Sequence, residues 1–283
     1  MKKTTPLALL ALVTISAFNI LIAIQLLAPI KHELTVSFLD IGQGDSIFIE
    51  SPTGVQLLID GGPDRSVLRE LPKRMGIFDR SIDVVLATHP DKDHIAGLTE
   101  VFNRYAVGTY VESGVEGDSS YVDSLAAAVT SERVNTILAK RGMRLHLGGG
   151  AYADILYPDR DVTNLETNTA SIVVRVVYGE SEFLLTGDAP ISVEDWLVDL
   201  DGEHLASDVL KAGHHGSRTS TSEEWITAVH PQYVVISAGE DNSYGHPHTE
   251  VVDRIRERGA RMLSTATDGT VTFTSDGQVL TVR

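Results

Sequence analysis

The sequence contains no cysteine and few positive charges. Without cysteine among its 283 residues, the chain can form no disulfide bond, thiolate metal site, cysteine nucleophile or lipidated-cysteine anchor, so any metal must bind histidine and carboxylate groups. Lys and Arg number 23 against 39 Asp and Glu, which leaves a formal net charge of −16. A chain this acidic is not expected to hold nucleic acid on a broad basic surface. A bound polyanion would need a local source of positive charge.

The first thirty residues form a segment with its own physical character. After Lys2 and Lys3, residues 6–30 carry no charge and would span roughly 37 Å as a helix, enough to cross a hydrocarbon core. Cleavage after the small-x-small triplet at 14–16 would leave a second apolar stretch at the new N-terminus, which disfavours a cleaved signal peptide. We therefore expect residues 1–30 to be an uncleaved signal anchor, a single transmembrane helix, with residues 31–283 outside the cell membrane. A buried core helix is the alternative.

Residues 31–283 have the composition of one globular α/β domain without internal repeats. Three strands, 34–39, 45–50 and 55–60, are expected to form an antiparallel meander, and a buried strand is expected at 82–88 between helical segments at 65–74 and 95–104. The later patterns predict helices at 122–138, 191–200 and 250–258, strands at 209–212 and 233–237, and hairpins at 171–186 and 271–283.

Six of the ten histidines lie in three short segments, at 89–94, 214–215 and 246–248. The first segment follows the predicted buried strand and offers four potential metal ligands in six residues, namely His89, Asp91, Asp93 and His94. In extended backbone the alternate side chains point the same way, so one loop could serve two ions. A solvated helix-capping loop, with Asp93 as the N-cap, is the alternative interpretation. Asp188 also follows a predicted strand and would be a natural bridging ligand, although its Thr-Gly-Asp motif is weak by itself.

Six ordered motifs resemble the metallo-β-lactamase fold, in the branch formed by the hydrolase domain of ComEC-type competence (DNA-uptake) proteins. They are FLDIGQGDS at 38–46, LIDGG at 58–62, HPDKDH at 89–94, TGD at 186–188, KAGHHGS at 211–217 and YGHPH at 244–248. The resemblance covers residues 34–283. It implies a four-layer αβ/βα sandwich, a dinuclear metal site in a cleft between the two halves, and hydrolysis of a phosphodiester.

The resemblance also implies a ligand set. His89 and Asp91 would hold one ion, Asp93, His94 and His214 the other, and Asp188 would bridge them. The choice between His214 and His215 stays open, with His214 favoured and His215 left as its neighbour or as a catalytic residue. This chain departs from the broader fold by having Asp91 in place of a histidine, and Asn168 in a segment that usually supplies another histidine. Asn168 is either at the site or a turn residue.

Charge arithmetic favours a phosphate substrate. Two divalent ions against three carboxylates would leave the site electropositive, and the ions would activate water for attack on phosphorus. His246 or His248 could then protonate the leaving alkoxide, although a rigid turn with surface histidines is the alternative for this segment. Ser217 could donate a hydrogen bond to the phosphate or cap a helix. The His and Asp ligand set suits Zn²⁺ or Mn²⁺, and no organic cofactor is indicated.

The sequence therefore predicts a membrane-anchored, metal-dependent phosphodiester hydrolase, a nuclease acting on DNA. The alternative enzyme is a cell-surface phosphodiesterase acting on choline-bearing or teichoic-acid-type polymers. A third hypothesis is a non-catalytic anchored binding module. No sequence feature indicates a protein partner.

Overall fold

The computed structural model describes residues 10–16 and 33–283 of the chain. By its internal contacts the chain divides into two units, Met1–Lys31 and His32–Arg283. The expected membrane span at 6–30 lies mostly outside the described residues. Its described part, residues 10–16, is helical. In the two described ranges, no helix combines the length and the apolar character needed to cross a bilayer.

The second unit is built on two β-sheets. The described strands of the first sheet lie in the order β15-β14-β1-β2-β3-β4-β5-β6, and those of the second in the order β13-β12-β11-β10-β9-β8-β7. The first sheet contains β1 (Leu34–Phe38), β2 (Ile47–Glu50), β3 (Gln56–Ile59), β4 (Ser81–Ala87), β5 (Ala106–Glu112), β6 (Asn135–Leu138), β14 (Val271–Ser275) and β15 (Leu280–Val282). The second contains β7 (Arg144–Gly148), β8 (Ala151–Tyr157), β9 (Val173–Tyr178), β10 (Ser181–Leu185), β11 (Val209–Lys211), β12 (Tyr233–Ile236) and β13 (Arg261–Ser264).

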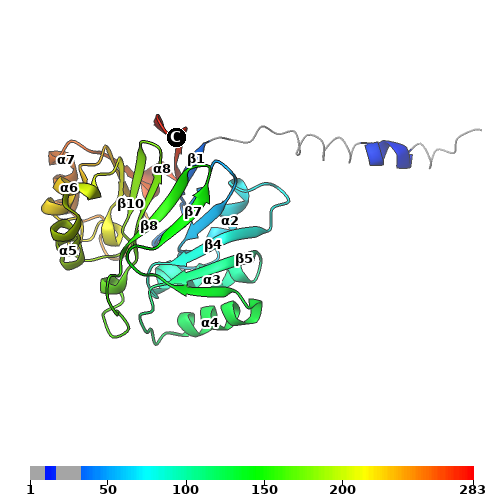
Figure 1. Cartoon of the computed structure of the whole chain (residues 1–283), viewed down its shortest axis with the longest axis horizontal. Helices are drawn as coiled ribbons and strands as arrows, with labels where there is room; N and C mark the ends of the chain where they lie inside the picture. The colour runs from blue at the N-terminus through cyan, green and yellow to red at the C-terminus, as the bar shows by residue number, and fades with distance from the viewer. Residues whose placement is uncertain (1–9, 17–32) are drawn as a thin grey trace, which may run out of the picture. The chain divides into compact units, whose positions relative to one another are not determined.

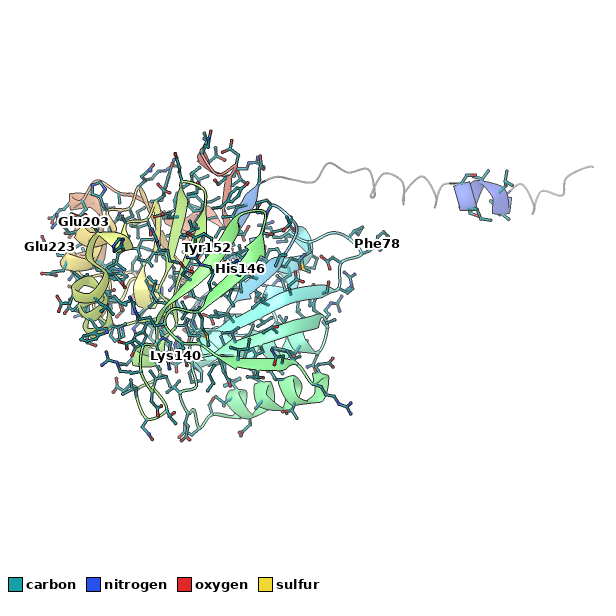
Figure 2. The ribbon with its side chains drawn as sticks, in the orientation of Figure 1. Phe78, Lys140, His146, Tyr152, Glu203 and Glu223 are labelled. Carbon is teal, nitrogen blue, oxygen red and sulfur yellow. The ribbon has the colours of Figure 1, made fainter. Side chains whose placement is uncertain are left out.

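Helices cover the outer face of each sheet, so the unit has four layers (Figure 1). The first sheet carries α2 (Val67–Glu70), α3 (Lys92–Phe102) and α4 (Ser120–Glu132), and the second carries α5 (Ile191–Asp201), α6 (Glu223–Val229) and α7 (Thr249–Glu257). Shorter elements are α8 (Thr265–Asp268), η1 (Leu71–Lys73), η2 (Asn168–Ala170), η3 (Gly202–Leu205) and η4 (Gly213–Gly216). The exposed side chains of Glu203 and Glu223 lie on the α5–α6 side (Figure 2), where they contribute to the acidic surface.

Apolar side chains fill the space between the two sheets. The ring of Phe273 in the first sheet packs edge-on against Phe183 in the second, with centroids 5.8 Å apart, and Phe38 lies 6.1 Å from the same ring. Separate apolar clusters join α3 and α4 to the first sheet and α5, α6 and α7 to the second. Each sheet is thus buried on both faces, as the continuous apolar run of β4 predicted.

Most expected elements are present. The β1–β2–β3 meander is antiparallel, and β9–β10 and β14–β15 are hairpins as expected. The predicted helix at 122–138 was wrong in its second half: α4 ends at Glu132, because Arg133 adopts a left-handed conformation (φ 54°) that stops the helix, and residues 135–138 pair with β5 as β6. The prediction omitted β5, β7, β8, β13 and α6. In β8 alternate residues are buried, a period-two pattern that could have identified it.

The parallel strands end at one edge of each sheet. In the first sheet β3 to β6 run parallel, and in the second β10 to β13 do so. Loops that follow such strands gather outside their carboxyl ends, which is where α/β sheets commonly place their sites. The histidine segments at 89–94 and 214–215 and the loop carrying Asp188 all follow strands of these two groups.

Candidate metal centre

Three loops bring histidine and aspartate side chains together. The loop after β4 supplies His89 and the start of α3, the loop after β10 supplies Asp188, and the turn after β11 supplies His214 and His215. The Oδ2 atom of Asp188 lies at the centre of this group. It is 3.3 Å from Nε2 of His94, 3.4 Å from Nε2 of His215, 3.7 Å from Nε2 of His214 and 4.0 Å from Nε2 of His89.

Each of three buried imidazoles is held by its Nδ1 atom. His94 Nδ1 donates to Asp60 at 2.8 Å, and His215 Nδ1 donates to the Ser237 carbonyl at 2.9 Å. His89 Nδ1 donates to the Thr88 hydroxyl at 3.0 Å, which in turn donates to Asp60 at 2.7 Å. These bonds orient the rings through Nδ1 and direct each Nε2 atom to the centre, which is the arrangement found at metal-ligating histidines.

Several buried atoms at the centre have no hydrogen-bond partner. Among the described residues these include Nε2 of His89, His94 and His215, together with Oδ1 of Asp188. Unpaired polar atoms in a protein interior cost free energy unless water or an ion satisfies them. Four imidazole and carboxylate groups, those of Asp45, His94, Asp188 and His215, place ligand atoms within 4.8 Å of one another. This donor set fits a bound divalent cation.

One further carboxylate, that of Asp60, and the ammonium group of Lys211 lie beside these four groups. Asp45 and Asp60 are buried, and the equally buried Lys211 contacts Asp45 Oδ2 at 2.6 Å and donates to the Gly187 carbonyl at 3.0 Å. Lys211 Nζ also lies 3.7 Å from Asp188 Oδ1. The sequence analysis assigned these three residues no role, although each lies inside one of the six motifs. Which side chains form a buried ion pair depends on contacts between distant parts of the chain, and short motifs do not contain this information.

The loop that carries Asp45 approaches the metal loop through Gly44. The Asp45 amide donates to the Asp93 carbonyl at 3.1 Å, and a Cβ atom on Gly44 would collide with the same carbonyl. Gly44 also has φ 126°, a conformation that other residues rarely adopt. A glycine is therefore required for the first motif to reach the centre.

Excess negative charge shapes the titration of the centre. For each ionisable group of the centre, burial is the largest single effect and disfavours the charged form. For His94 and His215, the combined charge of Asp188 and neighbouring carboxylates exceeds the effect of burial and raises the pKa of each imidazole well above its ordinary value. The pKa of the Asp188 carboxyl is held well below its usual range by His215 and His94, despite burial. Burial, together with the charge of His94, lowers the pKa of His89 to about 3, so His89 is a neutral imidazole. The metal centre therefore favours positive charge, as expected of a site that binds a cation.

Asp91 and Asp93 lie at the rim of the centre. Asp93 Oδ2 is 3.2 Å from Nε2 of His215, and Asp91 Oδ2 is 3.7 Å from Nε2 of His89. Asp91 stands at the N-cap of α3, but its side chain makes no capping hydrogen bond. The capping interpretation placed Asp93 at the N-cap, but Asp93 lies in the first turn of α3, and the Asp91 carboxylate lies on the His89 side of the centre.

The backbone of the second histidine segment is unusual. His214 and His215 both have positive φ, 48° and 56°, a left-handed conformation that is uncommon for residues with a Cβ and concentrates at functional sites. The two rings lie 6.0 Å apart at 73°. His215 is buried and reaches Asp93, whereas His214 is half-exposed and contacts Thr219 Oγ1 through Nδ1 at 3.1 Å.

His246 and His248 extend the histidine array outward. The His246 ring lies 5.5 Å from His214 and 5.0 Å from His248, and it stacks on Tyr244 at 5.6 Å. Burial, with the charges of the neighbouring histidines, lowers the pKa of His246 to about 4. His248 Nδ1 accepts the Arg218 amide at 3.1 Å, so the neutral ring carries its proton on Nε2.

Two other expected residues lie close to the ligand loops. Asn168 begins η2, and its buried Oδ1 has no hydrogen-bond partner. The same segment reaches the centre through Ser171, whose hydroxyl accepts the Asp188 amide at 3.2 Å. Ser217 is buried and accepts a hydrogen bond from the Thr219 hydroxyl at 3.0 Å. Ser217 does not cap a helix, because Ser222 is the N-cap of α6.

A four-layer αβ/βα sandwich with a buried His and Asp centre at one sheet edge is the architecture of metallo-β-lactamase-fold proteins. The chain belongs to the metallo-beta-lactamase superfamily, whose family model matches residues 39–240. Members of this superfamily are usually metal-dependent hydrolases, and the buried group fits a metal site.

The chain is also similar to competence proteins, which confirms the resemblance to the ComEC type. Competence protein ComA of Neisseria gonorrhoeae is 30% identical over 243 residues, which cover 86% of this chain and 32% of that protein. ComE operon protein 3 of Bacillus subtilis (strain 168) is 29% identical over 261 residues, 86% of this chain and 33% of that protein. The chain thus spans about a third of the length of these curated relatives.

Solved structures with the same fold include distant relatives. The metallo-beta-lactamase fold protein YhfI from Bacillus subtilis has a TM-score of 0.58 at 12% identity, over 86% of this chain and 99% of that chain. CmlA, a diiron beta-hydroxylase from Streptomyces venezuelae, has a TM-score of 0.55 at 16% identity, over 84% of this chain and 53% of that chain. At these identities the likeness establishes the fold alone.

Proposed function

We propose that this protein is a membrane-anchored, metal-dependent phosphodiester hydrolase that acts on DNA. The observation that carries the proposal is the convergence of three buried Nε2 atoms, with no hydrogen-bond partner, on the Asp188 carboxylate, in a chain similar to competence proteins. Residues 1–30 would be the anchor and residues 31–283 the hydrolase domain, which would lie outside the cell membrane.

We assign the ligands of two divalent ions, Zn²⁺ or Mn²⁺, from the measured distances. Asp93, His94 and His215 would hold one ion, since His215 Nε2 is 3.2 Å from Asp93. His89 and Asp91 would hold the other, and Asp188 would be shared. His214 is the remaining imidazole beside Asp188, so we assign it to the ion held by His89, whose usual third histidine is replaced by Asn168. His215 therefore takes the ligand position that the sequence analysis favoured for His214, and His214 becomes a ligand of the other ion.

The residues around the ions would orient the substrate and move protons. The bound ions would supply an acidified water molecule and offset the charge that develops on the phosphate oxygens. His248, with His246 between it and the ligands, would protonate the leaving alkoxide as an imidazolium, whose protonated Nδ1 would give up the hydrogen bond from the Arg218 amide. The Asn168 amide and the Ser217 hydroxyl would donate hydrogen bonds to the phosphate.

The test is hydrolysis by the purified full-length chain, with Mn²⁺ or Zn²⁺, of single-stranded DNA, duplex DNA and bis-(p-nitrophenyl) phosphate. His89→Ala should abolish cleavage of all three substrates, because it removes a ligand. His146→Ala is the matched control: this exposed histidine lies on β7, paired with Tyr152 of β8 (Figure 2), and the substitution should leave the rates unchanged. Equal activity of both variants would contradict the proposed centre.

A second candidate is a phosphodiesterase that acts on choline-bearing or teichoic-acid-type polymers. The net charge of −16 favours this candidate, since DNA binding commonly uses a basic surface. Cleavage of bis-(p-nitrophenyl) phosphate without cleavage of any DNA strand would support it. Metal binding without hydrolysis of any substrate would instead indicate a non-catalytic binding module.

A further inference from the structure

A cavity of about 230 Å³, here called the side pocket, opens next to the metal centre on the α3–α4 side of the first sheet. Its walls come from the carboxyl ends of β4 and β5, from α3 and from α4. His89 belongs to both sites: its ring lines the side pocket, while its Nε2 atom faces Asp91 and Asp188. A group bound in the side pocket would therefore lie one imidazole ring away from the proposed ions.

The walls of the side pocket combine apolar and polar surface, and the one carboxylate among its described lining residues lies on β5. Ile95, Leu125 and Val129 supply apolar surface, and Glu112 and Ser113 stand at the end of β5. Tyr110 lies two residues earlier on the same strand, and its hydroxyl interacts with the Glu112 carboxyl. A cavity with apolar walls and a few fixed polar groups is the usual form of a small-molecule site. Glu112 has no role in the metal centre or in the core.

The volume and chemistry of the side pocket select a single flat heterocycle. A cavity of about 230 Å³ is smaller than the roughly 300–1,000 Å³ of sites for drug-sized ligands, so it has room for one ring system. A nucleobase has two apolar faces and a hydrogen-bonding edge, and proteins that bind single strands hold unstacked bases between apolar side chains. In a phosphodiester bound at the metal centre, the neighbouring base is the group within reach of this cavity.

We propose that the side pocket binds the base beside the scissile phosphate and that Glu112 accepts hydrogen bonds from the edge of that base. The inference rests on the proposed phosphodiesterase activity and adds a base preference to it. A carboxylate accepts two parallel hydrogen bonds best from adjacent donors. Guanine offers N1–H and N2–H on one edge, adenine and cytosine offer one amino group, and thymine presents carbonyl oxygens on both sides of its single N–H. Guanine should therefore be preferred and thymine disfavoured.

A quaternary ammonium headgroup fits the side pocket less well. Choline-type cations are recognised by several aromatic faces arranged around the charge. Tyr110 is the one Phe, Tyr or Trp side chain among the described residues that line the side pocket, and its hydroxyl is engaged by Glu112. A neutral base with donor groups uses the carboxylate and the apolar walls together.

Two neighbouring alanines of α4 provide a matched pair of variants. Ala126 and Ala127 are both exposed, but only Ala126 lines the side pocket. Ala126→Trp should fill the side pocket and Ala127→Trp should leave it open, with the same change in helix propensity and apolar surface. Circular dichroism melting should give both variants the same unfolding temperature as the wild type, since neither position is in the core.

The experiment uses the full-length chain, with Mn²⁺, and thymidine oligonucleotides that carry guanine, adenine, cytosine or an abasic residue at one central position. Wild type and Ala127→Trp should cleave the phosphates beside guanine at least about fivefold faster than those beside thymine or the abasic residue, the range of a good bidentate contact. Ala126→Trp should cleave all positions at equal rates. Glu112→Gln should lose most of the guanine preference, because its amide offers one acceptor oxygen in place of two.

The outcomes separate this inference from the proposed function. Identical cleavage profiles for Ala126→Trp and Ala127→Trp, or equal cleavage beside guanine and the abasic residue, would overturn the side-pocket assignment and leave the nuclease intact. If the wild type cleaves no strand, the proposed function fails. Calorimetric measurement of deoxyguanosine monophosphate binding then tests whether the side pocket holds a base. Weaker binding to Ala126→Trp than to Ala127→Trp would support the assignment. Absent or equal binding, or tighter binding of phosphocholine, would overturn it.

Discussion

Removing the ammonium group of Lys211 should destabilise the metal-free protein strongly and the metal-loaded protein less. Lys211 is fully buried, and its Nζ atom lies 2.6 Å from Oδ2 of Asp45, whose side chain is 2% exposed. Asp45 also lies beside the proposed ligands, since it offers an oxygen within 4.8 Å of ligand atoms of His94, Asp188 and His215. Lys211→Met keeps most of the side-chain volume and removes the charge. The Asp45 carboxylate then stays buried without its main partner.

The size of the effect follows from burial. Breaking a buried ion pair by removing one partner costs about 3–5 kcal/mol, because the remaining charge is uncompensated. For a domain of this size, 1 kcal/mol lowers the unfolding temperature by roughly 2–4 °C, so Lys211→Met should lower it by roughly 6–20 °C in the presence of chelator. Added Zn²⁺ or Mn²⁺ should reduce the loss, since cations bound beside Asp45 would offset part of its charge.

The assay is thermal unfolding of the full-length chain in detergent, followed by tryptophan fluorescence. Trp225 is 1% exposed and reports the loss of the second helical layer. Asp45→Asn combined with Lys211→Met should recover most of the lost stability, because the double variant buries no unpaired charge. An unfolding temperature within about 2 °C of wild type for Lys211→Met, or no recovery in the double variant, would refute the reasoning.

Four further predictions concern the metal, the N-terminal segment, pH and salt. Asp93→Ala and Asp188→Ala should lose metal and hydrolysis while remaining folded, since Asp93 lies in the first turn of α3 and Asp188 in the loop between β10 and α5, both outside the apolar core. Unchanged metal content in elemental analysis would contradict the ligand set. A chain lacking residues 1–30 should be soluble and active, and activity that requires the segment would contradict the anchor assignment. Burial raises the pKa of Glu194 to about 7, above its ordinary 4.5. The free energy of unfolding should therefore fall by up to about 3 kcal/mol as pH rises from 4.5 to 7, because the folded state holds this proton more tightly than the unfolded state. Thermal melts at about pH 5.5 and pH 8 should show this loss for the wild type and not for Glu194→Gln. DNA binding by an inactive His248→Ala variant should weaken only gently with salt, with a slope of log K against log salt of about −1 to −3. Chelation of the metal should weaken binding more than salt does. Fluorescence anisotropy that gives a slope of about −5, unchanged by chelator, would indicate a basic surface.

Local sequence determined the family and the region of the site. The motif at 89–94 places four ligand-type side chains between the end of β4 and the first turn of α3, and this position followed from the β-branched run before it and the helical spacing after it. These are short-range properties: extended backbone alternates side chains, and a strand buried on both faces is continuously apolar. For the same reason the meander and the two hairpins were predictable, whereas the end of α4 depended on a single residue, Arg133.

Tertiary structure alone decided how the ligand-type residues are arranged. The left-handed backbone at 214–215 buries His215 beside Asp93 and leaves His214 half-exposed, a choice that adjacent identical side chains cannot reveal in sequence. The pairing of Lys211 with Asp45 and the side pocket beside His89 likewise join elements that are distant along the chain. The physical reason is that burial and low dielectric set the partner and the charge of each group, and both arise only when the two sheets pack and their strand ends meet.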